Sequence, residues 1–401
     1  MSNKIFLLII LFVGCRSDRK ETTIKDSEPT EDSIPDDITD VDDIDEPVDE
    51  QPPVDTGVQT KEPSVEIEDN DNDGVSAEYD CDDNNDELGD IANDEDCDGI
   101  QTYFDCDDLN GDTECELQLD LGGNKKLEMV FIPTGYEPNQ RYELTNDYYI
   151  MKTEVTQGTF EHVMNYDSRD GCGYSGCADY GEGDDFPAYY VSWHMAADFA
   201  NHVTMIHNQE FGTNLQECYT CSNTGLWNVE CVANSVPYQC TGYVLPTESE
   251  WEYAARSGTQ YDFWSIYGGG VASSDWDCNI NVLIQDGTNT SLLSDYSWFC
   301  GNQIFGTYIN SAKPTATKLP NGFGLYDMHG NVSEWVADFG GCNFPQTTVD
   351  PYCSFGSSTN VIRGGNWFDT PTAIGINSRI ENYPSFRYYG FGFRVVLHPP
   401  E

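Results

Sequence analysis

Acidic and aromatic residues are segregated along this chain, and the segregation limits how much of it can fold around a hydrophobic core. Residues 16–120 contain 40 of the 71 acidic residues and five of the 18 basic ones, a formal charge of −35. Trp, Tyr and Phe are concentrated between residues 123 and 398. Burial of apolar surface must offset the entropy of ordering the chain, so we expect a core only in the second part. The acidic balance also excludes nucleic acid as a partner, because phosphate binding requires a basic surface.

The first 15 residues resemble the signal peptide of an exported bacterial lipoprotein. Lys4 precedes an apolar run that is too short to cross a membrane and ends in LFVGC. The last four residues are similar to a lipobox, in which Cys15 would be lipidated and become the new N-terminus; an ordinary signal peptide or a chance apolar start is the alternative. We therefore expect export to the cell envelope and a lipid anchor in a membrane. For a Gram-negative host, Arg16 and Ser17 favour the outer membrane.

Two acidic segments follow the expected anchor. Residues 16–67 have the composition of a disordered linker, extended by its own charge. Residues 68–120 form a degenerate repeat in which YDCDD returns as FDCDD, and this segment resembles the Asp-rich calcium repeats of thrombospondin type 3. A spacer without specific ion binding is the alternative. A third interpretation, in which the repeat buffers calcium at the cell surface, is compatible with a binding role of the folded part. The expected ligands, which alternate before a glycine as in loops that bind hard cations, are Asp69, Asp71 and Asp73.

The cysteines indicate an oxidising compartment. Cys15 aside, 14 cysteines remain, an even number that an exported protein would pair. Short separations favour local bridges within two couples, Cys172 with Cys177 and Cys342 with Cys353. Two disulfides or one tetrahedral zinc ion are the alternatives for a further set of four, of which we favour the disulfides. This set is Cys218, Cys221, Cys231 and Cys240.

The part from residue 123 to residue 398 is predicted to be an irregular α+β domain. KLEMVFIPTGYE alternates as a strand does, and a helix is expected to begin near Thr156. A second helix is expected in residues 191–208 from its apolar spacing. A third opens with a capping box made by Thr247 and Glu250 and stops at Gly258. Beyond that glycine, short strands and loops prevail.

One stretch, GFGLYDMHGNVSEW at residues 322–335, combines turn-forming residues with residues that favour burial. A buried loop must satisfy its backbone polar groups locally or with a bound ion. The stretch therefore indicates either a loop closed by its own hydrogen bonds for structural reasons or a functional site.

Five segments together resemble the formylglycine-generating enzyme family, also called the sulfatase-modifying factor domain. They occur in the family's order and are MVFIPTG, KTEVTQGTF, YVLPTESEWEYAARSG, PNGFGLYDMHGNVSEWVADF and VIRGGNW followed by GFGFRVV. The resemblance implies one domain over residues 123–398 with a C-type-lectin-like fold and little regular secondary structure.

The resemblance also implies a structural calcium ion in the GLYD loop. Its ligands would be the Asp327 side chain with the carbonyls of Met328, Gly330 and Val332, which are the oxygen ligands that a hard cation takes. Glu334 and Trp335 would then be interior residues. His329 is expected to be an exposed loop residue, because no base or nucleophile accompanies it.

Members of this family that are enzymes oxidise a cysteine in a Cys-x-Pro-x-Arg segment of a sulfatase with O₂ and copper held by two cysteines. The corresponding positions here carry Asp369 and Ile374, and no cysteine follows Cys353. Cu(I) requires soft sulfur ligands, so no copper is expected. Further departures are Ser333, Asn366 and Gly390. Arg394 is expected to form a buried ion pair or a stack in the core.

The candidate cleft residues are those that the resemblance places near the family's active site, whether they match the family's motif or depart from it. Asp369 and Arg379 would carry out acid–base chemistry together or form a surface ion pair. An iron site is not expected, since the spacing of His194, His202 and His207 places no adjacent pair on one helix face. The full candidate set is Asn366, Asp369, Arg379 and Asn382.

Two hypotheses for the function follow. The first is a surface lipoprotein whose domain binds a protein, peptide or glycan without oxidase activity. The second is a formylglycine-generating oxidase or another enzyme on the same fold. Activity on a Cys-x-Pro-x-Arg peptide discriminates between the two.

Overall fold

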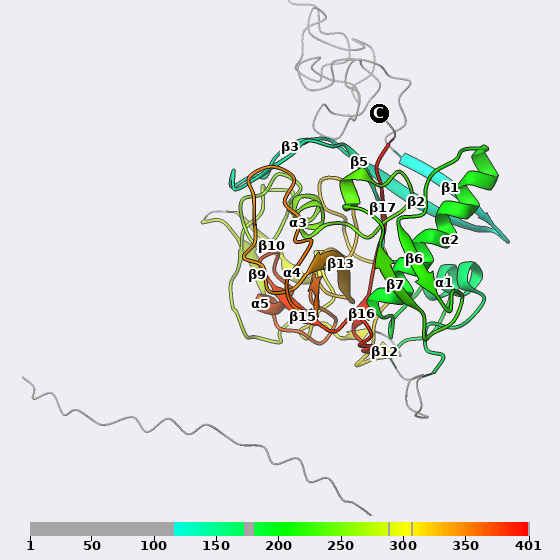
Figure 1. Ribbon diagram of the computed structural model, residues 1–401. Coiled ribbons are helices and arrows are strands. Elements are labelled where there is room, and N and C mark those ends of the chain that lie inside the picture. Colours follow the sequence, from blue (N-terminus) through cyan, green and yellow to red (C-terminus); the bar gives the residue numbers. More distant parts are fainter. Residues whose placement is uncertain (1–115, 172–179, 288, 306–307, 400–401) are drawn as a thin grey trace, which may run out of the picture. The chain divides into compact units, whose positions relative to one another are not determined.

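The computed structural model describes residues 116–171, 180–287, 289–305 and 308–399. They form an α+β fold in which two four-stranded sheets and a few helices are joined by long loops (Figure 1). Within these ranges, no helix has both the length and the apolar character needed to cross a bilayer. Several predictions lie outside the described residues: the signal peptide with Cys15, the linker 16–67, the ligands Asp69, Asp71 and Asp73, and the couple Cys172 and Cys177.

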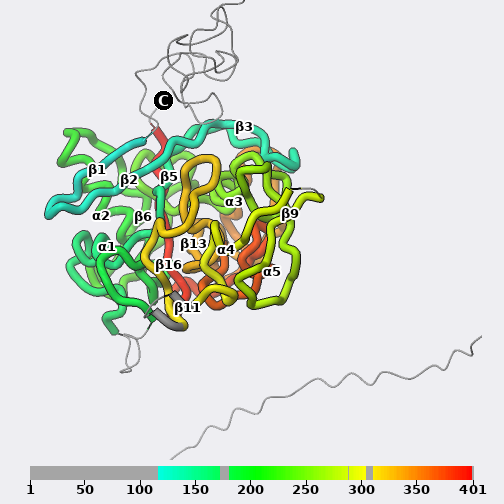
Figure 2. The backbone as a smooth tube through the Cα atoms, turned by 180° about the vertical axis from the view of Figure 1, so that it is seen from behind, coloured from blue at the N-terminus to red at the C-terminus, as the bar shows by residue number. Residues whose placement is uncertain are grey.

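The helices are short except for one. They are α1 (Gln157–Met164), α2 (Trp193–Phe211), α3 (Glu248–Arg256), α4 (Leu293–Tyr296) and α5 (Pro371–Ile374), with a 3-10 turn at Pro237–Gln239. Figures 1 and 2 show α1 and α2 at one side of the domain and α4 and α5 at the opposite side.

The first sheet is antiparallel and joins the two ends of the domain. Its order is β1 (Glu116–Gly122), β2 (Lys125–Ile132), β5 (Tyr148–Met151) and β17 (Val396–Leu397). Because Leu119 and Leu121 alternate with exposed residues, β1 buries one face while it pairs with β2. The strand β1 is therefore part of this sheet, although it precedes the predicted boundary at Gly123 and overlaps the segment assigned to the acidic repeat.

The second sheet organises the region around the buried loop. Its order is β15 (Arg379–Asn382), β14 (Asn360–Arg363), β13 (Ser333–Phe339) and β16 (Phe391–Gly392), and β13 pairs with β16 in parallel. Almost every residue of β13 is buried, so this strand crosses the interior. The parallel pair places the start of β13 beside the GFGF segment, which is more than 50 residues away in sequence.

Short hairpins complete the domain. They are β3 (Gly135–Tyr136) with β4 (Glu143–Leu144), β6 (Tyr219–Ser222) with β7 (Glu230–Ala233), β8 (Val271–Ala272) with β9 (Leu283–Gln285) and β10 (Thr290–Leu292), and β11 (Ile304–Phe305) with β12 (Tyr308–Ile309).

The predicted helix starts are confirmed. Thr156 caps α1 by accepting a hydrogen bond from the Thr159 backbone N–H. At α3, Thr247 and Glu250 form the reciprocal capping box that their spacing predicted. The end of α3 is a left-handed Ser257 just before Gly258, which also has a positive φ.

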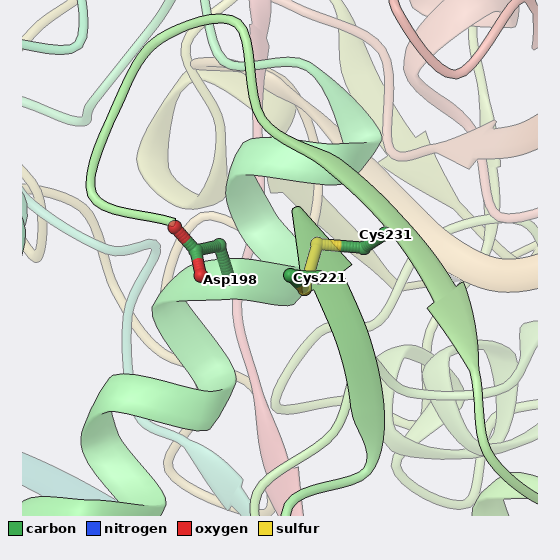
Figure 3. Close-up of side chains that lie close together, drawn as sticks. All are labelled: Asp198, Cys221 and Cys231. Carbon is green, nitrogen blue, oxygen red and sulfur yellow. A yellow bond between two sulfur atoms is a disulfide. The ribbon is translucent and has the colours of Figure 1, made fainter. Parts of the chain in front are cut away.

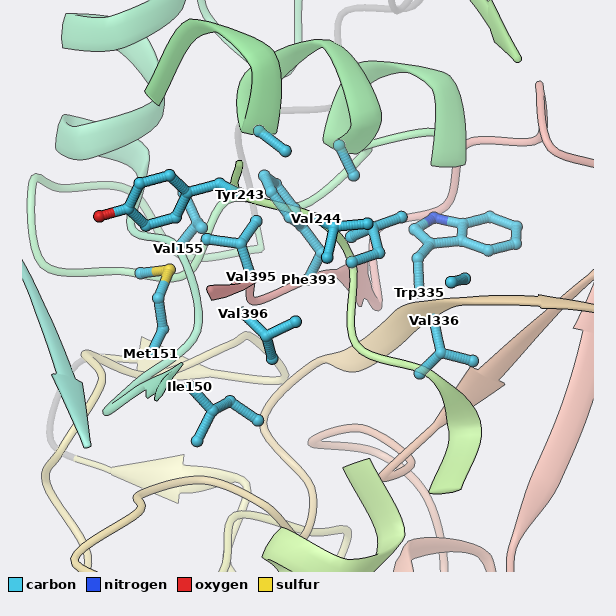
Figure 4. Packing of buried hydrophobic residues seen from close by; sticks show 14 of the residues in the cluster. Ile150, Met151, Val155, Tyr243, Val244, Trp335, Val336, Phe393, Val395 and Val396 are labelled. Atoms are coloured by element: carbon cyan, nitrogen blue, oxygen red, sulfur yellow. The ribbon is translucent and has the colours of Figure 1, made fainter. Parts of the chain in front are cut away.

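The main core lies between α2 and the strands of both sheets. Figure 4 shows Ile150, Val155, Val244, Trp335 and Phe393 packed together. Phe393 also meets the ring of Phe199 from α2 edge-on, with centroids 5.2 Å apart. The buried apolar residues thus hold α2, the β13 strand and the C-terminal segment against one another.

Candidate functional site

A turn after β14 returns the chain to the start of β13. Gly364 and Gly365 both have positive φ, and a Cβ on Gly365 would lie 2.4 Å from the Ala373 carbonyl oxygen. Asn366 follows, and its Nδ2 donates to Asp369 Oδ2 at 2.7 Å and to Ser333 Oγ at 3.3 Å. The turn therefore brings Asn366 and Asp369 of one loop against the first residue of β13.

Gly390 completes this arrangement. Its carbonyl accepts a hydrogen bond from the Ser333 N–H at 2.7 Å, and a Cβ at position 390 would lie 3.0 Å from Asn366 Cγ. Ser333, Asn366, Asp369 and Gly390, here called the Asn366 cluster, are thus in direct contact. The small residues at 333 and 390 make room for the larger Asn366.

Asp369 is the titratable group of the Asn366 cluster. Burial raises its pKa to about 6, although the Asn366 backbone N–H, at 3.1 Å from Oδ2, opposes this rise by stabilising the carboxylate. A carboxyl group with this pKa changes its charge near neutral pH. The other polar side chains of the cluster are the Asn366 amide and the Ser333 hydroxyl, whose oxygen accepts a hydrogen bond from that amide.

Arg379 and Asn382 lie on β15 and have other partners. Arg379 Nε donates to both carboxylate oxygens of Glu248 on α3, at 2.8 and 3.0 Å, and a second pair joins Arg379 to Glu381. Asn382 Oδ1 accepts from the Tyr383 N–H. The predicted partnership of Asp369 with Arg379 is wrong, because the buried acids of α3 attract the guanidinium. Of the four candidate residues, the structure joins Asn366 with Asp369.

Aromatic side chains lie beside the Asn366 cluster, where the Phe368 backbone N–H donates to Asn366 Oδ1 at 3.3 Å. Tyr180 and Tyr389 stack with ring centroids 4.3 Å apart, and Tyr388 and Phe368 lie 4.1 and 5.3 Å from the Tyr389 ring. Phe386, which is 41 % exposed, stacks on Tyr388. We call these five residues the aromatic surface; four are half-buried and Phe386 is exposed. The sequence analysis missed them, and the run FRYY before GFGF was the available signal.

The GLYD loop presents a buried carboxylate. Asp327 has a φ of 58°, and its Oδ2 accepts from the Ala316 N–H at 2.8 Å. Its Oδ1 has no hydrogen-bond partner among the described residues, although it is buried. Burial raises the pKa of Asp327 to about 6. An orphaned oxygen of a buried acid in this loop fits a cation, so the donor set is chemically suitable for the expected calcium ion.

Glu154 is a second buried acid near this loop, and the sequence analysis did not single it out. Its oxygens accept from the Val332 N–H at 2.9 Å and from Asn331 Nδ2 at 2.8 Å. Burial first, and then the charges of Asp327 and Glu334, raise the pKa of Glu154 well above its usual value. The local excess of negative charge further favours a cation here.

The predicted interior roles of Arg394 and Glu334 are confirmed. The fully buried Arg394 donates to both Glu334 oxygens at 2.7 and 2.8 Å and to the Met151 and Tyr326 carbonyls. Trp251 Nε1 also donates to Glu334 at 2.9 Å. This bidentate pair ties β13 to the C-terminal segment.

The prediction for His329 is wrong. The side chain is 4 % exposed, and its Nδ1 lies 3.0 Å from the Ile374 carbonyl oxygen. Burial lowers the pKa of His329 to about 4, so the ring is neutral at physiological pH. It packs against Phe263, which is why a polar residue in a glycine-rich loop lies in the interior.

The sulfatase-modifying factor enzyme 1-like domain matches residues 113–399. The chain belongs to this family. Relatives include the chaperone protein LppX of Paenibacillus barcinonensis, 26 % identical over 60 % of this chain and 74 % of that protein. The formylglycine-generating enzyme of Streptomyces coelicolor is 29 % identical over 39 % of this chain and 46 % of its own length. The inactive C-alpha-formylglycine-generating enzyme 2 of Mus musculus is 28 % identical over 39 % and 43 %. The chain thus spans about half the length or less of the two formylglycine-generating relatives.

The structure shows what occupies the positions of the copper cysteines in this member of the sulfatase-modifying factor family. Asp369 is held by Asn366, and Ile374 is fully buried in a separate core with Phe263, Ile284 and Leu293. The other family departures, at 333, 366 and 390, are the remaining members of the Asn366 cluster. Four of the five changed positions, all except Ile374, are therefore neighbours in space.

Disulfides link the described cysteines of this family member. Cys342 and Cys353 are bonded as predicted, and the ambiguous set of four forms two disulfides, Cys218–Cys240 and Cys221–Cys231 (Figure 3). Oxidised sulfurs are not thiolate ligands, so the zinc alternative does not apply to this state. Cys278–Cys300 was not predicted, because 22 residues separate the two and no local signal pairs them.

Proposed function

We propose that this protein is a non-enzymatic binding module of the sulfatase-modifying factor family. The observation that carries the proposal is the Asn366 cluster, in which four departures from the oxidase pattern contact one another. Asp369 and Ile374 offer a carboxylate and a core aliphatic group where Cu(I) would need two thiolates. A partly decayed active site would leave isolated substitutions, whereas these are mutually fitted.

The names of two relatives support this proposal. One is called a chaperone protein and another an inactive formylglycine-generating enzyme. The relative from Streptomyces coelicolor bears the name of the active enzyme, and formylglycine-generating oxidation of a sulfatase cysteine is therefore the alternative that an experiment must exclude.

The aromatic surface is the proposed contact region for a protein, peptide or glycan. Half-buried rings offer apolar area with little loss of side-chain entropy, and the partly buried Asp369 carboxyl, which the buried Asn366 amide holds in place, supplies a polar contact. Tyr and Phe grouped around a few polar groups is the composition typical of binding surfaces.

We further propose a structural calcium ion held by Asp327 Oδ1 with the Met328, Gly330 and Val332 carbonyls. The orphaned oxygen of Asp327 and the acidic surroundings from Glu154 support this assignment. A second calcium-binding region at Asp69, Asp71 and Asp73, and a lipid anchor at Cys15 in the outer membrane, remain proposals from the sequence. Together they describe a tethered, ion-stiffened module at the cell envelope.

The first experiment incubates the full chain with a Cys-x-Pro-x-Arg peptide, copper and O₂, beside an active formylglycine-generating enzyme. Mass spectrometry should find the peptide unchanged with this protein and converted by the control enzyme. Formylglycine in the product would refute the proposal.

The second experiment tests the aromatic surface. Ligands found for the wild type on peptide and glycan arrays should bind about two- to tenfold more weakly after Tyr389→Ala or Phe386→Ala, the loss of one aromatic contact of roughly 0.5–1.5 kcal/mol. Tyr136→Ala is the matched control, since Tyr136 is 61 % exposed on β3, and Figure 1 shows β3 at the opposite end of the domain from β16, the strand that follows Tyr389. Equal losses in all three variants would show that binding does not use the aromatic surface.

A further inference from the structure

A disulfide and a buried carboxyl group lie together on the α2 side of the domain. Cys221 and Cys231 are directly opposite in the β6–β7 hairpin. Both sulfur atoms and a carboxylate oxygen of Asp198, on α2, lie within 4.8 Å of one another. Figure 3 shows the Asp198 side chain extending from α2 beside the disulfide.

Asp198 is fully buried and only partly satisfied. Its Oδ2 accepts from the Gly225 N–H at 2.8 Å, while its Oδ1 accepts no hydrogen bond from any described residue. His202 Nδ1 is 3.6 Å from Oδ1 but lies closer, at 2.9 Å, to the Asp198 carbonyl oxygen. One oxygen of this buried acid is therefore available to the disulfide.

A groove lies beside Cys231, which is itself 4 % exposed. Its volume is about 410 Å³, and Cys231 lines it together with Trp193, His194, Val236, Phe339 and Tyr352. His194 Nδ1 accepts the Cys231 N–H at 3.1 Å, which fixes the imidazole beside the cysteine. The mostly apolar lining suits the side chains that flank a cysteine in a peptide.

We propose that Cys221–Cys231 is a redox-active disulfide that exchanges with a dithiol peptide or protein held in this groove, and that Asp198 donates a proton to the departing thiolate. This activity is independent of the ligand-binding function proposed above.

The exchange balances without a further reactant. A substrate thiolate attacks Cys231 Sγ, the bond to Cys221 Sγ breaks, and Cys221 leaves as a thiolate that takes the Asp198 proton. The second substrate thiolate then attacks the substrate sulfur of the mixed disulfide and releases Cys231. The substrate dithiol is oxidised to a disulfide by two electrons, the Cys221–Cys231 pair is reduced to two thiols, and the substrate's two protons end on that pair once Asp198 has been reprotonated.

The surroundings of Asp198 suit this role. Burial raises its pKa, so the carboxyl group retains a proton at higher pH than an exposed aspartate does. A thiolate next to an ionised carboxylate would place two negative charges in a poorly solvated site, which favours a protonated Asp198 when Cys221 leaves. Because a thiol is ordinarily less acidic than a carboxyl group, the proton then passes to sulfur. Within the described part of the chain, no acidic group is grouped with the sulfur atoms of the Cys218–Cys240 disulfide, which contact the Gln216 carbonyl.

The test reduces the full chain with limiting dithiothreitol, quenches with iodoacetamide at intervals and follows each cysteine by peptide mass spectrometry. In the wild type, Cys221 and Cys231 should be alkylated before the three other described disulfides. Asp198→Asn should slow their reduction at least about 100-fold, the lower end of the range for losing a general acid, and leave Cys218–Cys240 unchanged. Alkylation of Cys221 and Cys231 last, or an unchanged rate in a folded Asp198→Asn variant, would overturn the proposal.

A second variant keeps the proposal testable if Asp198→Asn misfolds, since misfolding would accelerate the reduction of all the disulfides together. Cys221→Ser leaves the Cys231 thiol at the groove and should form a mixed disulfide with oxidised glutathione. Cys218→Ser, which frees Cys240, is the matched control and should react at least about tenfold more slowly, as expected for a thiol without an adjacent proton-transfer group. Equal reactivity of the two variants would refute the assignment of Cys231 as the attacked sulfur.

Discussion

Replacement of Arg394 by Met should destabilise the domain strongly, because the guanidinium neutralises a carboxylate in the deepest part of the core. Both side chains are buried, with Arg394 at 0 % and Glu334 at 1 % exposure. The substitution leaves Glu334 with only the Trp251 hydrogen bond, and it leaves the Met151 and Tyr326 carbonyls without this donor. Breaking a buried pair by removing one partner costs about 3–5 kcal/mol.

The size of the effect is measured by urea unfolding followed through Trp fluorescence, with calcium held constant. The double variant Arg394→Met/Glu334→Leu should lose less stability than the sum of its two single variants, because it leaves no unpaired charge. Glu381→Gln is the matched control: it removes the partly exposed carboxylate of the Arg379–Glu381 pair, which should cost about 1 kcal/mol or less. The reasoning would be refuted if Arg394→Met cost no more than Glu381→Gln, or if the double variant showed additive losses.

Four further outcomes are expected. Asp369 has a folded pKa of about 6, above its ordinary 3.8, so the folded state binds this proton more tightly than the unfolded state does. The contribution of this carboxyl group to the free energy of unfolding is therefore present at low pH and is lost as pH rises from about 4 through about 6. Asp369→Asn should remove that part of the stability–pH curve, and identical curves for wild type and variant would contradict the assignment. Gly365→Ala should lower the free energy of unfolding by about 1–2 kcal/mol for the left-handed backbone and by a further ~1–3 kcal/mol for the clash with the Ala373 carbonyl. Gly212→Ala, which has a similar φ but open space around the position, should show only the backbone cost in the same urea assay. Transfer from calcium to EGTA should lower the Tm of the wild type but not of Asp327→Asn, and calorimetry showing equal Tm values for the wild type in both buffers would exclude the ion. Cys278→Ser/Cys300→Ser should lower the unfolding free energy by about 3 kcal/mol, since the bridge closes a loop of 22 residues; a change below about 0.5 kcal/mol would show that this bridge does not constrain the unfolded chain.

Short-range features of the sequence were sufficient for several elements. The capping box of Thr247 and Glu250, the start of α1 at Thr156 and the alternation in β2 depend on residues within one or two turns or one strand, so the sequence carries their physical causes directly. The family motifs also predicted the fold. The absence of any cysteine after Cys353 argues, from the sequence alone, against a thiolate copper site in that segment.

Only the tertiary structure decided how distant segments meet. The parallel pairing of β13 with β16 brings Ser333 to Gly390, and the Gly364–Gly365 turn brings Asn366 to both, so the Asn366 cluster exists only in the folded chain. The same holds for Glu154 beside the GLYD loop and for the burial of His329. Local periodicity and capping act over a few residues, whereas the partner of a charge or the cover of a loop depends on topology, which places residues more than 100 positions apart in contact.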